Sequence, residues 1–251
     1  MRGLSSAVYS VFAYVVFFGS FLYAIGFVQN AVVSKTIDSG AVGPFLPSLL
    51  INLVLLGVFA VQHSVMARPA FKRVWTRLVP AESERSTYVL FASLALLLLY
   101  WQWRPLPQTV WSLEDPVLSA GLMAVAWFGW GMVLVSTFLI SHFHLFGLSQ
   151  GFARILRRTG HGDAAFTTPF LYRWLRHPIY AGFIIAFWAT PNMSLGHLVF
   201  AIGTTGYILI GIWLEERDLV AQFGDRYRQY RETVGMLIPK RASRSRDKRP
   251  A

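Results

Sequence analysis

The sequence predicts an all-α, polytopic membrane protein with four full transmembrane helices and a C-terminal helical hairpin, five or six segments in all. Two observations predict this class. First, 55% of the 251 residues are hydrophobic and the mean hydropathy is +0.47. Second, several uncharged runs exceed the ~18 residues that mark a membrane-spanning helix. We expect one membrane domain over 1–240 and a basic, disordered tail over 241–251.

The four full spans are expected at uncharged stretches between polar loops, over 8–28, 45–66, 86–103 and 117–140. Trp101 and Trp103 close the third span, as aromatic residues often do at the membrane interface. In the fourth span, Gly121, Gly129 and Gly131 would permit close contact with another helix.

The C-terminal hairpin is predicted from two apolar runs that helix-breaking residues separate. Pro178 suits the first turn of a helix, where a missing N–H leaves nothing unpaired. The run 179–189 would be roughly 17 Å long as a helix, which is too short for the ~30 Å hydrocarbon core. Pro191 and Gly196 then reverse the chain, and a longer helix returns over 197–214.

This hairpin would bring polar residues from its two ends together. His177 and Tyr180 stand at its start, and Glu215 and Glu216 follow its uncharged return helix directly. A carboxylate in that position is costly unless it faces a cavity or a partner. We therefore expect the chemistry of the protein at this end of the hairpin.

The basic residues predict orientation. The chain has five Lys and Arg in 66–85, five in 141–177 and ten after 214, whereas the three intervening loops have one, one and none. This asymmetry predicts that both termini and the polar site face the cytoplasm. The net charge of +11 is then explained by contact with anionic membrane lipid, and no nucleic-acid partner is expected.

Residue content excludes several kinds of site. There is no cysteine, which excludes disulfides, thiolate metal sites and a cysteine nucleophile. His142 and His144 are two apart, which places them on different faces of a helix, so no metal site is expected. No pattern indicates an oligomeric state.

The C-terminal segment repeats aromatic residues at helical spacing. Phe223, Tyr227 and Tyr230 are four and three residues apart and would share one face of a helix. Two interpretations remain open, a helix on the membrane surface or a lid over a cofactor.

Several of these motifs resemble a known family. RHPIYAG (176–182), EERDL (215–219) and FGDRYRQY (223–230), with a later proline, resemble the C-terminal signature of the isoprenylcysteine carboxyl methyltransferase-like superfamily. VQHSVMARPAFKRVW (61–75) and SHFHLFGLSQ (141–150) resemble its bacterial methanethiol S-methyltransferase branch. The resemblance implies a membrane enzyme, in the bacterial inner membrane, that transfers a methyl group from S-adenosyl-L-methionine to a small thiol such as methanethiol, releasing dimethyl sulfide.

The resemblance also implies a cofactor site, mainly within 141–235. Its residues would be Phe166, Thr167, Tyr172, His177, Pro178, Tyr180, Glu215, Glu216 and Tyr227. The chain departs from carboxyl-methylating relatives at Gly211, where they place an arginine that holds the substrate carboxylate. A small, uncharged residue there argues against a carboxylate substrate.

A thiol substrate must react as its thiolate, and a cysteine-like thiol with a pKa of about 8.5 is mostly protonated at neutral pH. A nearby histidine could accept its proton, or an arginine could stabilise the anion. We therefore expect His63 or His144, with Gln62 nearby, to fill this role. Three other functions stay open: methylation of prenylcysteine or lipid amines, an NADPH-dependent membrane reductase, and a non-catalytic assembly protein.

Overall fold

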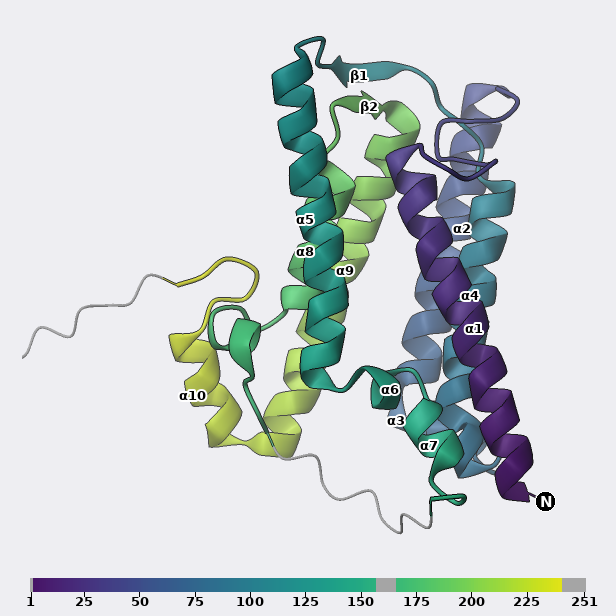
Figure 1. Ribbon diagram of the computed structural model, residues 1–251, viewed down its shortest axis with the longest axis vertical. Coiled ribbons are helices and arrows are strands. Elements are labelled where there is room, and N and C mark those ends of the chain that lie inside the picture. Colours follow the sequence, from purple (N-terminus) through teal and green to yellow (C-terminus); the bar gives the residue numbers. More distant parts are fainter. Residues whose placement is uncertain (1, 157–165, 241–251) are drawn as a thin grey trace, which may run out of the picture.

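A computed structural model describes residues 2–156 and 166–240, and most of these residues are helical (Figure 1). The predicted tail over 241–251 lies outside them. The long helices are α1 (Arg2–Gln29), α2 (Phe45–Ala67), α4 (Ala81–Gln102), α5 (Pro116–Ile140) and α9 (Leu195–Phe223), and α8 (Pro178–Trp188) runs beside them. The short ones are α3 (Pro69–Trp75), α6 (His142–Leu145), α7 (Leu148–Phe152), the 3-10 turn η1 (Phe170–Arg173) and α10 (Asp225–Thr233).

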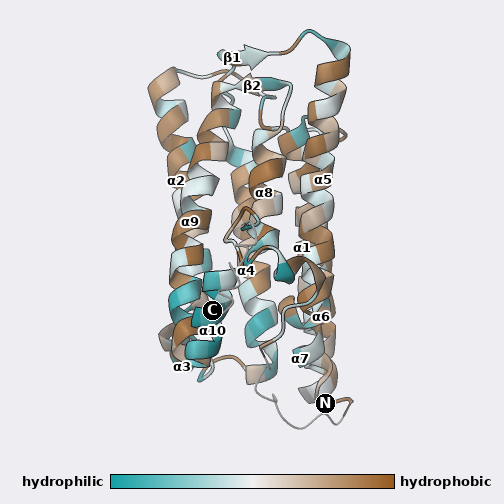
Figure 2. Ribbon diagram, turned by 90° about the vertical axis from the view of Figure 1, so that its left-hand side faces the viewer, coloured by the Kyte–Doolittle hydropathy of each residue, from teal (hydrophilic) through white to brown (hydrophobic). Residues whose placement is uncertain are grey.

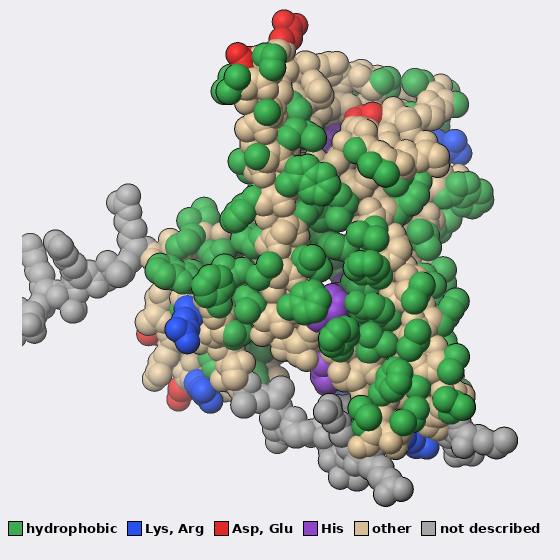
Figure 3. All heavy atoms as spheres, viewed as in Figure 1, with side chains coloured by type: hydrophobic (Ala, Val, Ile, Leu, Met, Phe, Trp, Pro, Cys, Tyr) green, Lys and Arg blue, Asp and Glu red, His purple; other side chains and the backbone are tan. Residues whose placement is uncertain are grey.

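Four helices are long and apolar enough to cross a membrane, namely α1 from Gly3, α2, α5 and α9. Hydrophobic side chains cover the upright helices on the face seen in Figure 3, and hydrophilic residues gather around α10 in Figure 2. These features confirm the predicted all-α, polytopic membrane fold.

The predicted third span, 86–103, corresponds to a helix of the bundle. It lies within α4, which packs against α1 and α2. Glu82, Glu84 and Arg85 occupy the first turns of α4, before the predicted span begins, and α4 is less apolar as a whole than α1, α2, α5 and α9. The return arm of the hairpin is longer than predicted, because α9 continues to Phe223 and reaches 29 residues, long and apolar enough to cross a membrane.

The long helices form two groups, α1, α2 and α4 in one and α5, α8 and α9 in the other (Figure 1). Contacts between α2 and α9 join them. An aromatic core also connects the groups: the Phe200 ring of α9 lies edge-on to Trp103 and Phe27, with centroids 5.8 and 6.2 Å away. Such edge-to-face pairs add stability beyond the area that they bury.

The predicted hairpin is confirmed. Pro178 is the first residue of α8, and α8 spans the 11 residues to Trp188. The chain then turns through β2 (Asn192–Ser194), and the Ser194 hydroxyl caps α9 by accepting from the His197 N–H at 3.0 Å. β2 pairs antiparallel with β1 (Thr109–Ser112) at the end of the bundle opposite α10 (Figure 1). This sheet was not expected, because strands of four and three residues carry no clear periodic signal.

Helices α5 and α8 cross at two glycines. A Cβ atom built on Gly129 would lie 2.7 Å from both the Gly182 carbonyl oxygen and the Ala186 nitrogen. Of the three glycines expected to permit close contact, only Gly129 does so among the described residues. Cβ atoms on Gly121 and Gly131 would meet nothing within 4 Å.

We expect Gly129→Val to lower the midpoint of thermal unfolding, because the new side chain would force α5 away from α8. Overpacking of this kind costs about 1–3 kcal/mol. The matched control is Gly131→Ala on the same helix, where the methyl group enters open space and alanine favours the helix. Equal unfolding midpoints for the two variants would contradict the close backbone contact.

Candidate active site

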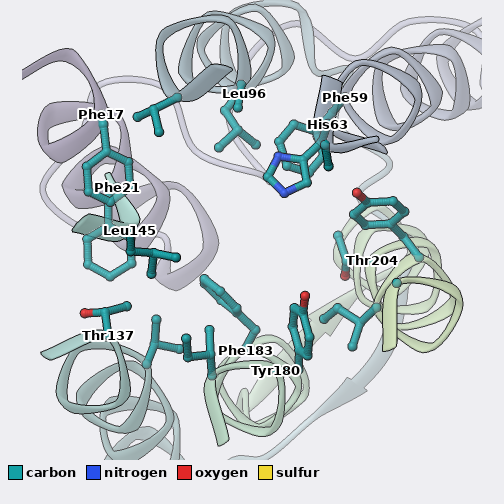
Figure 4. Close-up of a pocket in the computed structure, with 18 of the residues that line it drawn as sticks. Phe17, Phe21, Phe59, His63, Leu96, Thr137, Leu145, Tyr180, Phe183 and Thr204 are labelled. Carbon is teal, nitrogen blue, oxygen red and sulfur yellow. The ribbon is translucent and has the colours of Figure 1, made fainter. Parts of the chain in front are cut away.

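A cavity of about 620 Å³ lies between the two helix groups. This volume is within the ~300–1,000 Å³ typical of small-molecule sites. Much of its wall is apolar, with Phe17, Phe21, Leu96 and Phe183 converging on the space in Figure 4. Its polar and charged lining includes His63, Arg68, Arg85, Tyr88, Tyr172, Arg176, His177, Tyr180, Tyr207, Glu215 and Asp218. The arrangement suits a ligand that is partly apolar and partly charged.

The hairpin brings together the residues that the sequence predicted to converge. The Tyr180 hydroxyl donates to Glu215 Oε2 at 3.0 Å. His177 lies between the two carboxylates, with Nδ1 3.8 Å from Glu215 Oε2 and Nε2 3.1 Å from Glu216 Oε1. His177, Tyr180 and Glu215 all line the cavity. The Glu215 side chain is 46% exposed, so its carboxylate is open to a ligand.

Glu216 has a different environment, because it is buried among cations and does not line the cavity. Its carboxylate accepts from Arg176 Nε at 2.7 Å and lies 3.1 Å from Arg231 Nε. The Arg176 guanidinium also donates to the Val234 carbonyl at 2.6 Å. These bonds tie α9, the start of the hairpin and α10 to one another, so Glu216 holds the wall of the cavity in place.

The aromatic residues of the C-terminal segment form a cluster around Phe166. Its ring lies 5.4, 5.8 and 5.2 Å from those of Phe223, Tyr227 and Tyr230. Phe166 and Tyr227 therefore pack together behind the cavity wall and do not line the cavity. Thr167 and Pro178 do not line it either. The prediction that Phe223, Tyr227 and Tyr230 share one face of a single helix is wrong, because the helix breaks at Gly224: Phe223 ends α9 and the two tyrosines lie on α10. All three rings nevertheless meet at Phe166.

Tyr172 connects this cluster to the cavity. Its carbonyl accepts a hydrogen bond from the Tyr230 hydroxyl. Its own hydroxyl is buried and has no hydrogen-bond partner among the described residues, although the side chain lines the cavity. Burial and then the charge of Glu215 raise the pKa of Tyr172, so its hydroxyl stays neutral and can donate to a ligand.

Of the three candidates for proton transfer, only His63 reaches the cavity. Figure 4 shows its imidazole pointing into the space, across from Tyr180. His63 Nε2 lies 2.8 Å from the Tyr88 hydroxyl, while Nδ1 is buried without a partner among the described residues. Gln62 lies outside the cavity lining and donates to Met66 Sδ at 3.2 Å. His144, on α6, is exposed and does not line the cavity.

The sequence reasoning did not identify His142 as part of this cavity. His142 is buried and lines it, with Nε2 2.9 Å from the Tyr14 hydroxyl and Nδ1 2.8 Å from Thr137 Oγ1. Both ring nitrogens are thus engaged, which gives His142 a structural role between α1 and α5. Within 2–156 and 166–240, no group of three or more His, Cys, Asp or Glu could hold a metal ion.

Comparison with known proteins identifies close relatives. The chain is 54% identical over 239 residues to methanethiol S-methyltransferase of Mycobacterium tuberculosis, covering 95% of this chain and 98% of that protein. It is 56% identical over 235 residues to methanethiol S-methyltransferase 1 of Bradyrhizobium diazoefficiens, covering 94% and 82%.

A more distant relative is Nurim of Mus musculus, 31% identical over 188 residues that cover 69% of each chain. No family model matches the chain, and no solved structure is significantly similar to it. The extent and identity of the bacterial matches show that the chain belongs to the methanethiol S-methyltransferase family.

Proposed function

We propose that this protein transfers a methyl group from S-adenosyl-L-methionine to methanethiol, producing dimethyl sulfide and S-adenosyl-L-homocysteine. The observation that carries the proposal is an apolar cavity that joins a carboxylate–hydroxyl pair, Glu215 and Tyr180, to the His63 imidazole, whose Nδ1 has no partner among the described residues. The names of the relatives agree with this chemistry.

The polar end of the cavity fits a cationic methyl donor. S-adenosyl-L-methionine, when bound, supplies an electrophilic methyl group on a sulfonium. Glu215 offers a carboxylate to the donor's ammonium or ribose hydroxyls, and the unpartnered Tyr172 hydroxyl offers a hydrogen bond. His177 and Tyr180 complete this group. In this proposal, Glu216, Pro178, Phe166, Thr167 and Tyr227 support the site from outside the cavity.

The thiol would lose its proton to His63. In that role, Nε2–H donates to the Tyr88 hydroxyl, which leaves the lone pair on Nδ1, an atom that has no hydrogen-bond partner among the described residues. The S–H electron pair stays on the thiol sulfur and forms the new S–CH₃ bond. The pair of the broken S–CH₃ bond stays on the donor sulfur. Because this displacement is in line, fixing both partners in one cavity supplies much of the acceleration.

The wall near Gly211 favours a compact, uncharged substrate over a carboxylate. Gly211 lines the cavity, and a Cβ atom built there would meet nothing within 4 Å. The apolar walls suit methanethiol, which is small and lipid-soluble. The distribution of Lys and Arg further supports a bacterial inner-membrane protein whose site opens to the cytoplasm.

Glu215→Gln is expected to weaken binding of S-adenosyl-L-homocysteine about 10- to 150-fold, because a charged hydrogen-bond acceptor contributes roughly 1.5–3 kcal/mol. Titration calorimetry on the detergent-solubilised protein measures this affinity. The control Glu114→Gln changes an exposed carboxylate near the sheet, and it should bind as the wild type does. Equal affinities for both variants would remove Glu215 from the donor site.

The proposed reaction is tested with purified protein, methyl-labelled S-adenosyl-L-methionine and a panel of thiols, carboxylates and amines. Label should appear in dimethyl sulfide and not in esters or methylated amines. In parallel, S-adenosyl-L-homocysteine should raise the unfolding midpoint and NADPH should not. Stabilisation by NADPH alone would support a reductase, and stabilisation by neither would support a non-catalytic protein.

A further inference from the structure

The charges that line the cavity are not all compensated. Arg68 pairs with Asp218, with Nη1 3.2 Å from Oδ2, and Arg176 pairs with Glu216. Arg85, the third cavity-lining arginine, has no carboxylate within 4 Å in the part of the chain that the structure describes. Its positive charge can therefore interact with a ligand inside the cavity.

Arg85 is held beside the imidazole that faces the cavity. Its Nε donates to the Leu145 carbonyl at 2.7 Å. Its guanidinium lies over the Tyr88 ring, 5.0 Å from the centroid, and the Tyr88 hydroxyl reaches His63 Nε2. Arg85 and Tyr88 are three residues apart on α4, so they share one helix face. Because Arg85 is only partly exposed, its field is weakly screened by solvent.

The carboxylate that can interact with a ligand in the cavity lies on a different helix from Arg85. Glu215, on α9, has an exposed carboxylate with no arginine or lysine within 4 Å among the described residues, and Tyr180 of α8 donates to it. The cavity thus places an unpaired cation on α4 and an accessible anion on α9. A cationic ligand is favoured near Glu215 and an anionic one near Arg85.

We propose that Arg85, Tyr88 and His63 form a subsite for a small alkanethiolate. This inference rests on the proposed function and assigns the thiol to the α2–α4 side of the cavity. The S–H bond breaks heterolytically, His63 Nδ1 takes the proton, and the charge of Arg85 stabilises the sulfur anion. His63 then releases the proton to the medium, which restores the neutral imidazole for the next turnover. Tyr88 is the positioning residue of this subsite, because its hydroxyl holds His63 Nε2 at 2.8 Å.

The apolar surroundings add to this arrangement. A thiolate and a sulfonium combine into two neutral thioethers, so charge disappears as the reaction proceeds. An apolar environment destabilises the charged thiolate and sulfonium more than the neutral products, which favours the reaction. The fixed charges of Arg85 and Glu215 offset the cost of bringing the two ions into the cavity.

The test compares kcat/KM for methanethiol across neutral and alkaline pH in the wild type, Arg85→Gln and Arg85→Lys. Arg85→Gln should lower kcat/KM about tenfold at neutral pH, as expected if the pKa of the bound thiol rises by about one unit. The loss should diminish at alkaline pH, and it should be smaller for the more acidic 2,2,2-trifluoroethanethiol. Arg85→Lys should retain most of the wild-type profile.

The control is Arg73→Gln, which removes an exposed arginine outside the cavity and should leave the profile unchanged. Should Arg85→Gln fail to fold, Tyr88→Phe keeps the ring under Arg85 and removes only the bond to His63. Tyr88→Phe should lower kcat/KM for methanethiol about tenfold, the size of one lost hydrogen bond of ~1.4 kcal/mol, with unchanged affinity for S-adenosyl-L-homocysteine.

Two results would overturn the thiolate subsite while the proposed function stands. One is an active Arg85→Gln protein whose loss is the same at every pH and for both thiols. The other is wild-type kcat/KM in either Arg85→Gln or Tyr88→Phe. If the wild-type protein methylates no thiol at all, the proposed function itself fails.

Discussion

Replacing His63 with alanine is expected to lower the turnover of methanethiol at least ~100-fold, the lower end of what a positioned general base contributes. His63 is the only one of the three predicted proton-transfer residues that lines the cavity, and its Nδ1 has no partner among the described residues. Affinity for S-adenosyl-L-homocysteine should be kept, because the predicted donor residues belong to α8, α9, α10 and the segment before α8, and none lies on α2. Headspace measurement of dimethyl sulfide gives the turnover.

The control for His63→Ala is His144→Ala. His144 is exposed on α6 and does not line the cavity, so its loss should change turnover less than about twofold, as for most surface substitutions. The proposed role of His63 would be rejected if His144→Ala abolished turnover and His63→Ala did not. Reduced donor affinity in His63→Ala would also count against it, since the defect would then lie in cofactor binding.

Glu216→Gln is expected to destabilise the protein by about 3–5 kcal/mol, the usual cost of removing one partner from a buried ion pair. The side chains of Glu216 and Arg176 are each only 8% exposed. The neutral amide would leave the Arg176 guanidinium buried without its counter-charge. Because Arg176 also holds the Val234 carbonyl, we expect α10 to detach first. Thermal unfolding and limited proteolysis near Arg231 measure both effects.

The control for Glu216→Gln is Asp225→Asn, the same kind of change in an exposed pair. Asp225 Oδ1 lies 2.6 Å from Arg228 Nη1, and both side chains are largely exposed. Such pairs contribute about 0–1 kcal/mol, so the unfolding midpoint should hardly change. If both variants melted alike, Glu216 would not be the connection between the hairpin and α10.

Much of the fold could be predicted from hydropathy and helix-breaking residues. Long uncharged runs predicted α1, α2 and α5, and Pro178 with the short run behind it predicted the hairpin. The α9 helix was longer than expected, because its amphipathic end continues past the carboxylates to Phe223. The β1–β2 sheet was missed, since its strands are short and about eighty positions apart.

The candidate site could be predicted only in part. His177, Tyr180 and Glu215 were identified because each stands at the end of an uncharged run, where a polar side chain is costly unless it has a partner or faces a cavity. Arg85 and Tyr88 were not identified, although their spacing shows that they share a helix face. The spacing of residues along α4 does not reveal that α4 packs against α2. The hydrogen bond between Tyr88 of α4 and His63 of α2 depends on that packing.

The same limit applies to Phe166 and Tyr227. The resemblance assigned both to the cofactor, and the structure places both rings in a packed cluster behind the cavity wall. The two interpretations of the C-terminal segment, a helix on the membrane surface or a lid over a cofactor, therefore both stay predictions. The cluster, with Arg176 and Glu216, shows that α10 is fixed to the hairpin by specific contacts.

The most direct test of the central claim is transfer of an isotopically marked methyl group. Purified protein would be incubated with S-adenosyl-L-methionine carrying a trideuteriomethyl group and with unlabelled methanethiol, and the headspace analysed by mass spectrometry. We predict dimethyl sulfide that carries one deuterated and one ordinary methyl group, formed by the wild type and much more slowly by His63→Ala and Glu215→Gln. A folded wild-type protein that binds the donor yet yields no such product would contradict the account.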